Sequence, residues 1–169
     1  AGEIDYLAGL AQPEVGVITN ASPAHLAEFG SLDGIIAGKG ELLDHLPPTG
    51  AAVLNVDSPG WQTWQQRARC RVVSLGHKAG DHRWSCTADA AGSTLELDGT
   101  PWPVPLPGEH NAVNLAAAIL AARELGVTDD EIHAGLATFS GSPHRGVALE
   151  IGGRMVLDDA YNANPGSML

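Results

Sequence analysis

The sequence predicts an α/β domain: a mostly parallel sheet flanked by helices, with a small antiparallel flap. Three observations carry this prediction. Short β-branched apolar runs alternate with amphipathic segments over residues 15–76, alternating hydrophobicity follows over residues 82–107, and helical patterns come next. Continuous apolar runs between helices are typical of parallel strands, because helices cover both faces of such sheets.

The composition fits one globular domain. The chain has 169 residues, of which 44% are hydrophobic and 17% charged, so it has enough apolar side chains to bury a core. A net charge of −11 argues against a nucleic-acid-binding surface, which needs a basic face. No segment approaches the ~20 apolar residues of a membrane span. Two distant cysteines and the lack of a secretory signal at the start indicate a reduced, cytoplasmic compartment.

The first half of the chain predicts a β-α-β-α-β unit. A helix over residues 3–11, with Ile4, Leu7 and Leu10 on one face, comes first. Short apolar runs predict three buried strands, and helical spacing predicts the two segments between them, the first with Ser31 as its N-cap. The strands are expected in residues 14–20, 51–60 and 71–76, and the helices in 31–46 and 60–70.

The second half begins with the flap. Asp98-Gly99 is a strong hairpin signal within residues 82–107. A long helix follows and stops at Gly126, and a capping box at residues 128–131 opens another helix to about Phe139. Two closing strands, in residues 146–151 and 154–159, are joined by two glycines.

Lys39 stands in or beside the apolar stripe of its predicted helix. The residues three or four positions away are all large and aliphatic: Ile35, Ile36, Leu42 and Leu43. Two interpretations are open. Either the lysine stem covers apolar surface while its amine reaches water, or burial depresses the pKa of the amine enough for it to act as a nucleophile or take up carbon dioxide.

Polar side chains occur where parallel sheets collect ligands, after the end of a strand. Asn20 ends the first predicted strand, and His25 follows it as either a structural or a ligand-binding residue. Asn111 and Asn114 lie one turn apart at the start of the long helix. Their amides either cap that helix or, because an amide both donates and accepts, bind a flat heterocycle such as adenine.

An arginine and a pair of carboxylates complete the candidates. Arg145 lies among small and turn-forming residues, where it binds phosphate or carboxylate or is simply a surface arginine. Asp158 and Asp159 end the last predicted strand, and such a pair is suited to ribose hydroxyls or hydrated Mg²⁺. The string HKAGDH, residues 77–82, has a spacing typical of metal ligands, but a solvated loop is the simpler interpretation.

Three strings together resemble the Mur ligases. They are AHLAEFGSLDGIIAGKGEL, LPGEHNAVNLAAAI and LDDAYNANPGSM, and the resemblance covers nearly the whole chain. It implies the central ATP-binding domain of a three-domain amide-bond ligase that uses ATP and Mg²⁺. The DDxYNANP string is specific to the family member that joins D-Ala-D-Ala to UDP-MurNAc-tripeptide through an acyl phosphate, a step of peptidoglycan precursor synthesis.

The resemblance also implies roles for residues near the reacting groups. Lys39 matches the lysine that is carbamylated in several Mur ligases, where the carbamate is an oxygen ligand of a second Mg²⁺. His25 matches a histidine near that metal, and Arg145 lies where the family has an arginine near the γ-phosphate.

For the rest of the nucleotide, the resemblance implies four further residues. Asn111 and Asn114 fall in the family's HNxxN string, with Asn114 as the partner of adenine. Asp159 matches the residue that meets the ribose, with Asp158 as its neighbour.

The family's GTxGKT phosphate loop and the acidic ligand of its first magnesium do not occur in these 169 residues. We therefore expect a P-loop-type fold without its first strand and loop, with residues 1–157 as the central domain and residues 158–169 as the hinge to a C-terminal domain. We expect the isolated chain to be inactive in ligation and to bind ATP weakly. Two alternatives remain: a ligase like folylpolyglutamate synthase (FPGS), against which the YNANP string argues, and a non-catalytic nucleotide-binding or scaffolding module.

Overall fold

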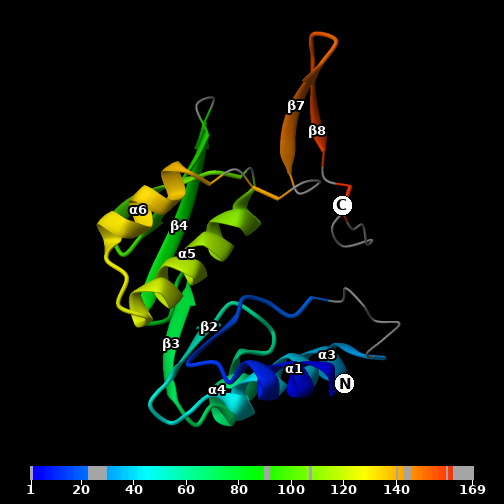
Figure 1. Cartoon of the computed structure of the whole chain (residues 1–169), viewed down its shortest axis with the longest axis vertical. Helices are drawn as coiled ribbons and strands as arrows, with labels where there is room; N and C mark the ends of the chain where they lie inside the picture. Colours follow the sequence, from blue (N-terminus) through cyan, green and yellow to red (C-terminus); the bar gives the residue numbers. More distant parts are fainter. Residues whose placement is uncertain are drawn as a thin grey trace.

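The computed structural model describes residues 2–22, 30–89, 92–106, 108–139, 141–142, 146–158 and 160–161. In these residues it contains a six-stranded sheet and a separate hairpin (Figure 1). The sheet strands, in spatial order, are β1 (Val15–Ile18), β2 (Ala51–Asn55), β3 (Arg71–Gly76), β4 (His82–Asp89), β5 (Gly92–Leu97) and β6 (Thr100–Val104). The hairpin pairs β7 (Val147–Ile151) with β8 (Arg154–Asp158).

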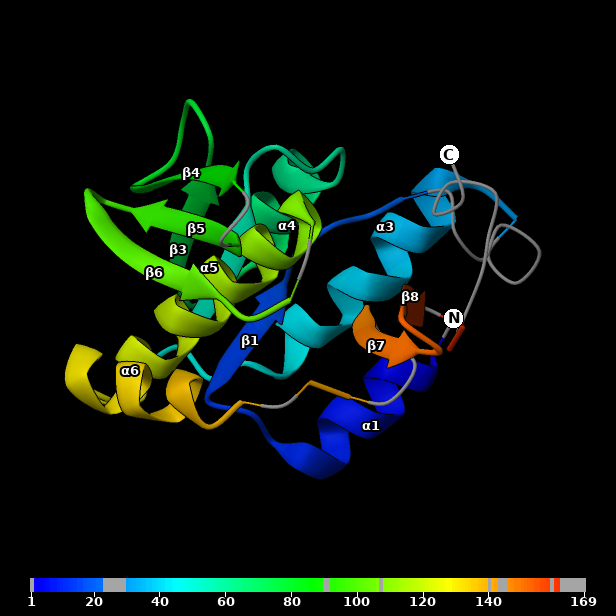
Figure 2. The same cartoon turned by 90° about the horizontal axis from the view of Figure 1, so that it is seen from above.

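Helices lie before and between these strands in the chain (Figure 2). They are α1 (Glu3–Ala11), α3 (Leu32–Gly40), α4 (Trp61–Arg67), α5 (Glu109–Glu124) and α6 (Asp129–Ala137), and the 3₁₀ helix η1 (Glu41–His45) continues α3. The predicted fold class is confirmed, and so is the β-α-β-α-β order of the first half. The prediction of one long helix over residues 31–46 is wrong in its second part, because Glu41–His45 form a 3₁₀ helix after α3.

The parallel part of the sheet is the most buried part. β1 pairs with β2, and β2 with β3, in parallel register. Every residue of β2 is buried, as expected for a central strand that has helices on both faces. The carboxyl ends of β1, β2 and β3 therefore share one edge of the sheet.

The predicted antiparallel flap exists, but it is continuous with the sheet. β3 and β4 pair in parallel at Leu75–His82 and Gly76–Arg83, and β4, β5 and β6 then pair antiparallel. The expected turn joins β5 to β6, with positive φ values of 53° at Asp98 and 80° at Gly99, as two-residue hairpin turns require.

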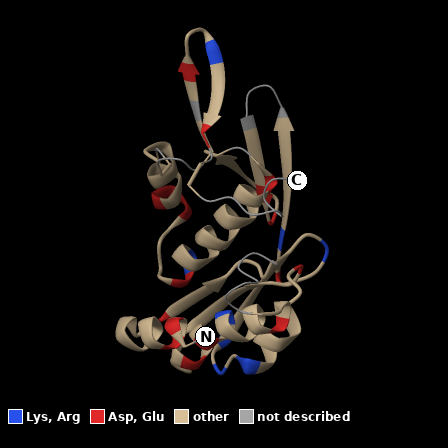
Figure 3. Ribbon diagram, turned by 90° about the vertical axis from the view of Figure 1, so that its right-hand side faces the viewer, with Lys and Arg blue, Asp and Glu red and all other residues tan. Residues whose placement is uncertain are grey.

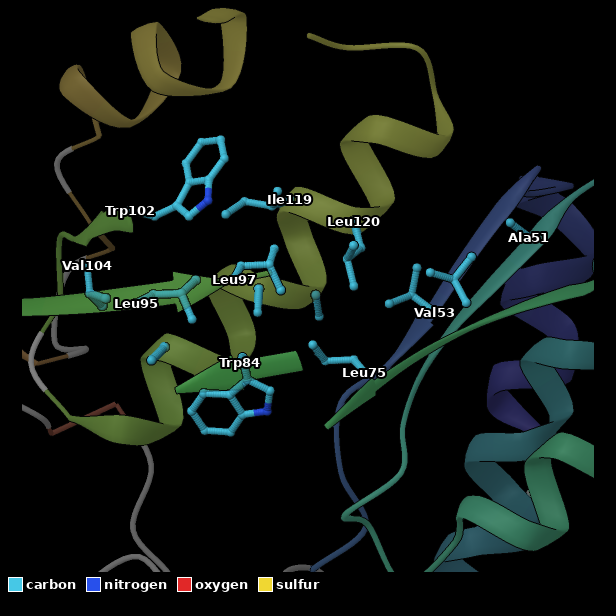
Figure 4. Packing of buried hydrophobic residues seen from close by; sticks show 14 residues of the cluster. Ala51, Val53, Leu75, Trp84, Leu95, Leu97, Trp102, Val104, Ile119 and Leu120 are labelled. Carbon is cyan, nitrogen blue, oxygen red and sulfur yellow. The ribbon is translucent and has the colours of Figure 1, made fainter. Parts of the chain in front are cut away.

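Two hydrophobic clusters lie on opposite faces of the parallel strands. One contains residues of β2 to β6 and α5 and is built around Trp102, while the other contains residues of β2, α3, η1 and α4 and is built around Trp64. Figure 4 shows side chains of β5, β6 and α5 meeting in the first cluster. α5 thus covers one face of the sheet, and α3 and α4 cover the other.

Local signals place the helix ends. The Ser31 side chain accepts a hydrogen bond from Gly34 N at 3.0 Å, which confirms the predicted N-cap of α3. The predicted capping box is present at α6, between Thr128 and Glu131. α5 ends before Gly126, whose φ of 81° is the left-handed conformation that terminates helices.

Some apolar side chains of α1 and of the β7–β8 hairpin remain exposed. Leu7 and Leu10, predicted to share a face of α1, are 53% and 67% exposed, because the contacts of α1 with η1 are largely polar. Figure 3 shows acidic positions on several helices and few, scattered basic ones. None of the helices in the described ranges combines the length and the hydrophobicity that a membrane crossing requires.

Candidate functional site

Polar groups line the edge formed by the carboxyl ends of β1, β2 and β3. Asn20 follows β1, Asn55 ends β2, and His77 follows β3. The sequence analysis selected Asn20 but missed Asn55 and Ser58, which are only 8% and 5% exposed. The signal for them was available, because both stand at or just after the end of a fully apolar strand.

Asn55 and Ser58 fix the backbone around Asn20. Asn55 Nδ2 donates to the Thr19 carbonyl at 2.9 Å, and Ala21 N donates to Ser58 Oγ at 3.0 Å. The Asn20 carbonyl is thus held on both sides by groups of the β2 turn. It accepts a hydrogen bond from Lys39 Nζ at 2.6 Å, so the loop after β1 and helix α3 meet at this amine.

Lys39 is half-buried near the end of α3, with its neighbours Ile35 and Ile36 fully inside the core. Burial lowers the pKa of the Lys39 amine from its ordinary value. A lowered pKa enlarges the neutral fraction of the amine, which is the form that attacks an electrophile such as carbon dioxide. Both earlier interpretations stay open, because Nζ is half-buried and donates to a backbone carbonyl at the strand edge.

Two side chains of α4 hold the end of α3, next to Lys39. Where the α-helix changes to 3₁₀ geometry, Glu41 N donates to Gly38 O. The carbonyl groups of Ile36 and Ala37 accept hydrogen bonds from side chains of α4. Trp64 Nε1 donates to Ile36 O and Arg67 Nη1 to Ala37 O, each at 2.9 Å. A Cβ at Gly40 would lie 2.9 Å from Arg67 Nη1, so this glycine makes room for the arginine rather than for a ligand.

Arg67 also binds Asp44 of η1, which predicts a specific pH dependence of stability. The hydrogen bonds from Arg67 hold the pKa of the Asp44 carboxyl below its usual range. A lowered folded-state pKa stabilises the fold above the unfolded-state pKa of about 4, and this stabilisation is lost as the pH falls through the lowered value. In urea unfolding, Asp44→Asn is therefore expected to be less stable than wild type at pH 7 and to approach it at pH 2–3.

A matched control for this measurement is Glu96→Gln, which also removes one negative charge but lies exposed on β5. A stability difference between Asp44→Asn and wild type that stays constant from pH 7 to pH 2 would refute the assigned role of the ion pair.

A pocket of about 310 Å³ opens beside the first turns of α5. Apart from Asn111 and Asn114 its lining is apolar, and it comprises Val104, Pro105, Leu106, Leu115, Ala118, Leu136 and Phe139. Small-molecule sites span roughly 300–1,000 Å³, so this volume suits one ring system rather than a whole nucleotide. Amides on an apolar wall are suited to a flat heterocycle with donors and acceptors on its edge.

Asn111 and Asn114 are thus brought together, as predicted, and neither is the N-cap residue of α5. That position belongs to Gly108, which has a φ of 98° and no side chain. His77 Nε2 lies 3.2 Å from Glu109 Oε1, which places the start of α5 next to the carboxyl end of β3. The Lys39 amine, which meets the loop after β1, and the start of the helix that carries both amides therefore lie at the same edge of the sheet.

The remaining predicted residues have different outcomes. His25, Arg145 and Asp159 lie outside the described residues. Asp158 ends β8, where its Oδ1 accepts from Ala160 N at 3.3 Å, and it is not among the residues that line the pocket.

The string HKAGDH forms no metal site. Its three candidate ligands have separate partners: Glu109 for His77, Ser74 for Asp81 and Asp98 for His82. Within the described ranges, no three histidine, cysteine or acidic side chains are grouped closely enough to hold a metal ion.

Comparisons with known proteins show which proteins the chain resembles in sequence and in fold. Residues 1–122 match the family model described as the Mur ligase middle domain. The chain is 36% identical, over 99% of its length, to the UDP-N-acetylmuramoyl-tripeptide–D-alanyl-D-alanine ligase of Escherichia coli, and it spans 39% of that relative. A crystal structure of MurF from Acinetobacter baumannii is similar with a TM-score of 0.91 at 33% identity, covering 99% of this chain and 38% of that one.

Two further solved structures are similar to the chain. MurF ligase from Thermotoga maritima, solved in complex with ADP, is similar with a TM-score of 0.81 at 28% identity, covering 98% of this chain and 40% of that one. A mutant of L. casei FPGS is similar with a TM-score of 0.70 over 93% of this chain and 40% of that one, but at 19% identity this likeness shows the fold alone.

Proposed function

The chain belongs to the Mur ligase family, and from this premise we propose that it supplies the ATP-binding part of a peptidoglycan-precursor ligase. The reaction would join D-Ala-D-Ala to UDP-MurNAc-tripeptide, as the names of the curated relatives indicate for those proteins. The chain spans little more than a third of these relatives' length, so the ligation activity and both substrates are proposals for the whole protein.

The observation that carries the proposal is the apolar pocket bordered by Asn111 and Asn114. Its volume suits adenine, and one planar amide is able both to donate to and to accept from the edge of that base. The positive end of the α5 dipole lies beside this pocket and favours the negative charge of a nucleotide. In this proposal Asn114 binds the base, and Asp159, with Asp158 as its neighbour, is expected to bind the ribose.

Lys39 fits a magnesium site only after modification. Mg²⁺ takes oxygen ligands, and an ammonium group offers none. The neutral amine attacks carbon dioxide, loses a proton and becomes a carbamate, which provides anionic oxygens. Mg²⁺, when bound, would neutralise the crowded phosphate and carboxylate oxygens of the reaction. The carbamate keeps one N–H, and the Asn20 carbonyl is placed to accept it.

Other parts of the proposal rest on the family resemblance. His25 near the metal and Arg145 near the γ-phosphate stay predictions, as do the division into a central domain over residues 1–157 and a hinge over residues 158–169. A cytoplasmic location also stays a prediction. The FPGS-like alternative has only fold-level support, at 19% identity. The scaffolding alternative predicts no preference for any nucleotide base.

A binding experiment on Asn114 tests the proposal. Asn114→Leu keeps the approximate size of the side chain but removes both hydrogen-bonding groups, so ADP affinity is expected to fall roughly tenfold or more. NMR spectra recorded with millimolar ADP would report changes in the chemical shifts of the Asn111 and Asn114 side-chain amides and of the backbone amides around the pocket. Gln62→Leu is the matched control, because it removes an exposed amide from α4 on the opposite face of the sheet.

The proposal requires ADP to perturb the pocket residues of the wild type and UDP to perturb them less. Equal affinities for ADP in the wild type and in Asn114→Leu would refute the assignment of adenine to this pocket.

A further inference from the structure

Helix α6 forms one wall of the pocket although it is only shallowly attached to the domain. None of its residues is buried. Leu136 and Phe139, at and just beyond its end, line the same pocket as Asn111 and Asn114 of α5. The position of α6 therefore sets how far apart these two walls stand.

The most specific contacts of α6 are an aromatic stack and an ion pair. The His133 ring stacks on Trp102 of β6, with centroids 4.0 Å apart and planes inclined by 19°. Asp129 binds Arg123 of α5 through two hydrogen bonds of 2.8 Å. The Arg123 guanidinium carbon lies 5.7 Å from the centre of the Trp102 ring, so both contacts converge on one fully buried indole.

The orientation of the His133 ring is fixed by its own helix. Nδ1 lies 2.8 Å from the Asp129 carbonyl oxygen, which only accepts, so Nδ1 carries the proton. The ring thereby lies against Trp102, although His133 as a residue is exposed.

The stack and the pocket wall lie on the same faces of their elements. Trp102 is two residues before Val104, and alternate residues of a strand face the same side. His133 is three residues before Leu136, and this spacing places both on one side of a helix. The stack is thus two residues from the pocket along β6, at Trp102, and about one helical turn from it along α6, at His133.

We propose that His133 is a positioning residue that, through its stack on Trp102, fixes the width of the pocket and so its preference for a fused two-ring base over a one-ring base. This rests on the proposed function, which assigns adenine to the pocket. A wall that moves outward loses van der Waals contact with a purine, whereas a smaller pyrimidine gains nothing from the fixed distance.

The test uses the chain with ADP and UDP as probes, at millimolar concentrations. His133→Ala removes the stack, and ADP affinity is expected to fall roughly two- to tenfold, the range of an aromatic pair, with UDP affinity unchanged. His133→Phe restores a flat ring and is expected to recover most of the ADP preference. Asp129→Asn weakens the ion pair and is expected to act in the same direction as His133→Ala.

Gly135→Ala is the matched control on α6. A Cβ at Gly135 meets no atom within 4 Å, so this change raises helix propensity without touching the docking contacts. Amide hydrogen exchange would be followed in parallel: His133→Ala is expected to accelerate exchange in α6 only, with α5 unchanged.

The outcomes distinguish a failure of the proposed function from a failure of the role given to the His133–Trp102 stack. A wild type that shows no preference for ADP refutes the proposed function, while the exchange data still decide whether the stack holds α6. Unchanged ADP-to-UDP selectivity in His133→Ala, or a His133→Phe variant that behaves like His133→Ala, overturns the role of the stack.

Discussion

Replacing Lys39 by alanine is expected to lower the turnover of the ligase that contains this domain by at least about a hundredfold. Removing a side chain that only hydrogen-bonds to a metal ligand already costs roughly 10–100-fold in metal affinity or activity. The proposal makes Lys39, as a carbamate, a direct metal ligand. Its half-buried amine and its 2.6 Å hydrogen bond to Asn20 O are the observations that motivate this role.

The lysine content of the chain provides the control. Lys78 is the only other lysine among the 169 residues and lies exposed after β3, so Lys78→Ala is expected to retain near-wild-type turnover. A short carboxylic acid added to Lys39→Ala should restore part of the activity, since it returns an anionic oxygen to the vacated space. Unchanged turnover in Lys39→Ala would end the carbamate proposal.

Trp64→Ala is expected to destabilise the fold by about 3–5 kcal/mol, the usual cost of removing a large buried aromatic side chain. Trp64 has no exposed surface and lies at the centre of the cluster that joins β2, α3 and α4. Its Nε1 also donates to Ile36 O, so the change additionally releases the end of α3 next to Lys39. Urea unfolding measures the loss of stability.

Two milder variants separate packing from hydrogen bonding. Trp64→Phe keeps much of the ring but has no N–H, and it is expected to lose about 1 kcal/mol for the hydrogen bond, besides a packing cost. Trp61→Phe, a change on the same helix at a partly buried position, is the matched control. A loss below 1 kcal/mol in Trp64→Ala would show that this cluster does not hold α3 in place.

The sequence predicted elements whose signals are local. Ser31, Thr128 and Gly126 mark helix ends because capping depends on a few neighbouring residues. The end of α3 instead has partners on another helix, because Trp64 and Arg67 of α4 donate to its carbonyls. The junction of the flap with β3 likewise depends on tertiary pairing, which periodicity alone does not specify.

Residues of the candidate site likewise differ in whether their role has a local signal in the sequence or depends on tertiary contacts. Lys39, Asn111 and Asn114 could be selected from the sequence, because an amine in an apolar stripe and amides at a helix start are local patterns. The pocket wall formed by Leu136 and Phe139 could not, since it depends on where α6 docks. Asn55 and Ser58 have a local signal at the end of β2, but their contacts with the loop after β1, 36 and 37 residues away in sequence, could not be predicted from it.

The central claim is that the amide pocket on α5 and the amine on α3 serve one nucleotide and its metal. Paramagnetic relaxation by millimolar Mn²⁺-ADP tests it most directly, with resonances assigned along the chain. The account predicts shifts at Asn111 and Asn114 from the base, and strong broadening around Asn20 and Lys39 from the metal. Leu125, at the opposite end of α5, should be unaffected. Broadening centred at that opposite end, or base-induced shifts without any broadening at Lys39, would contradict the account.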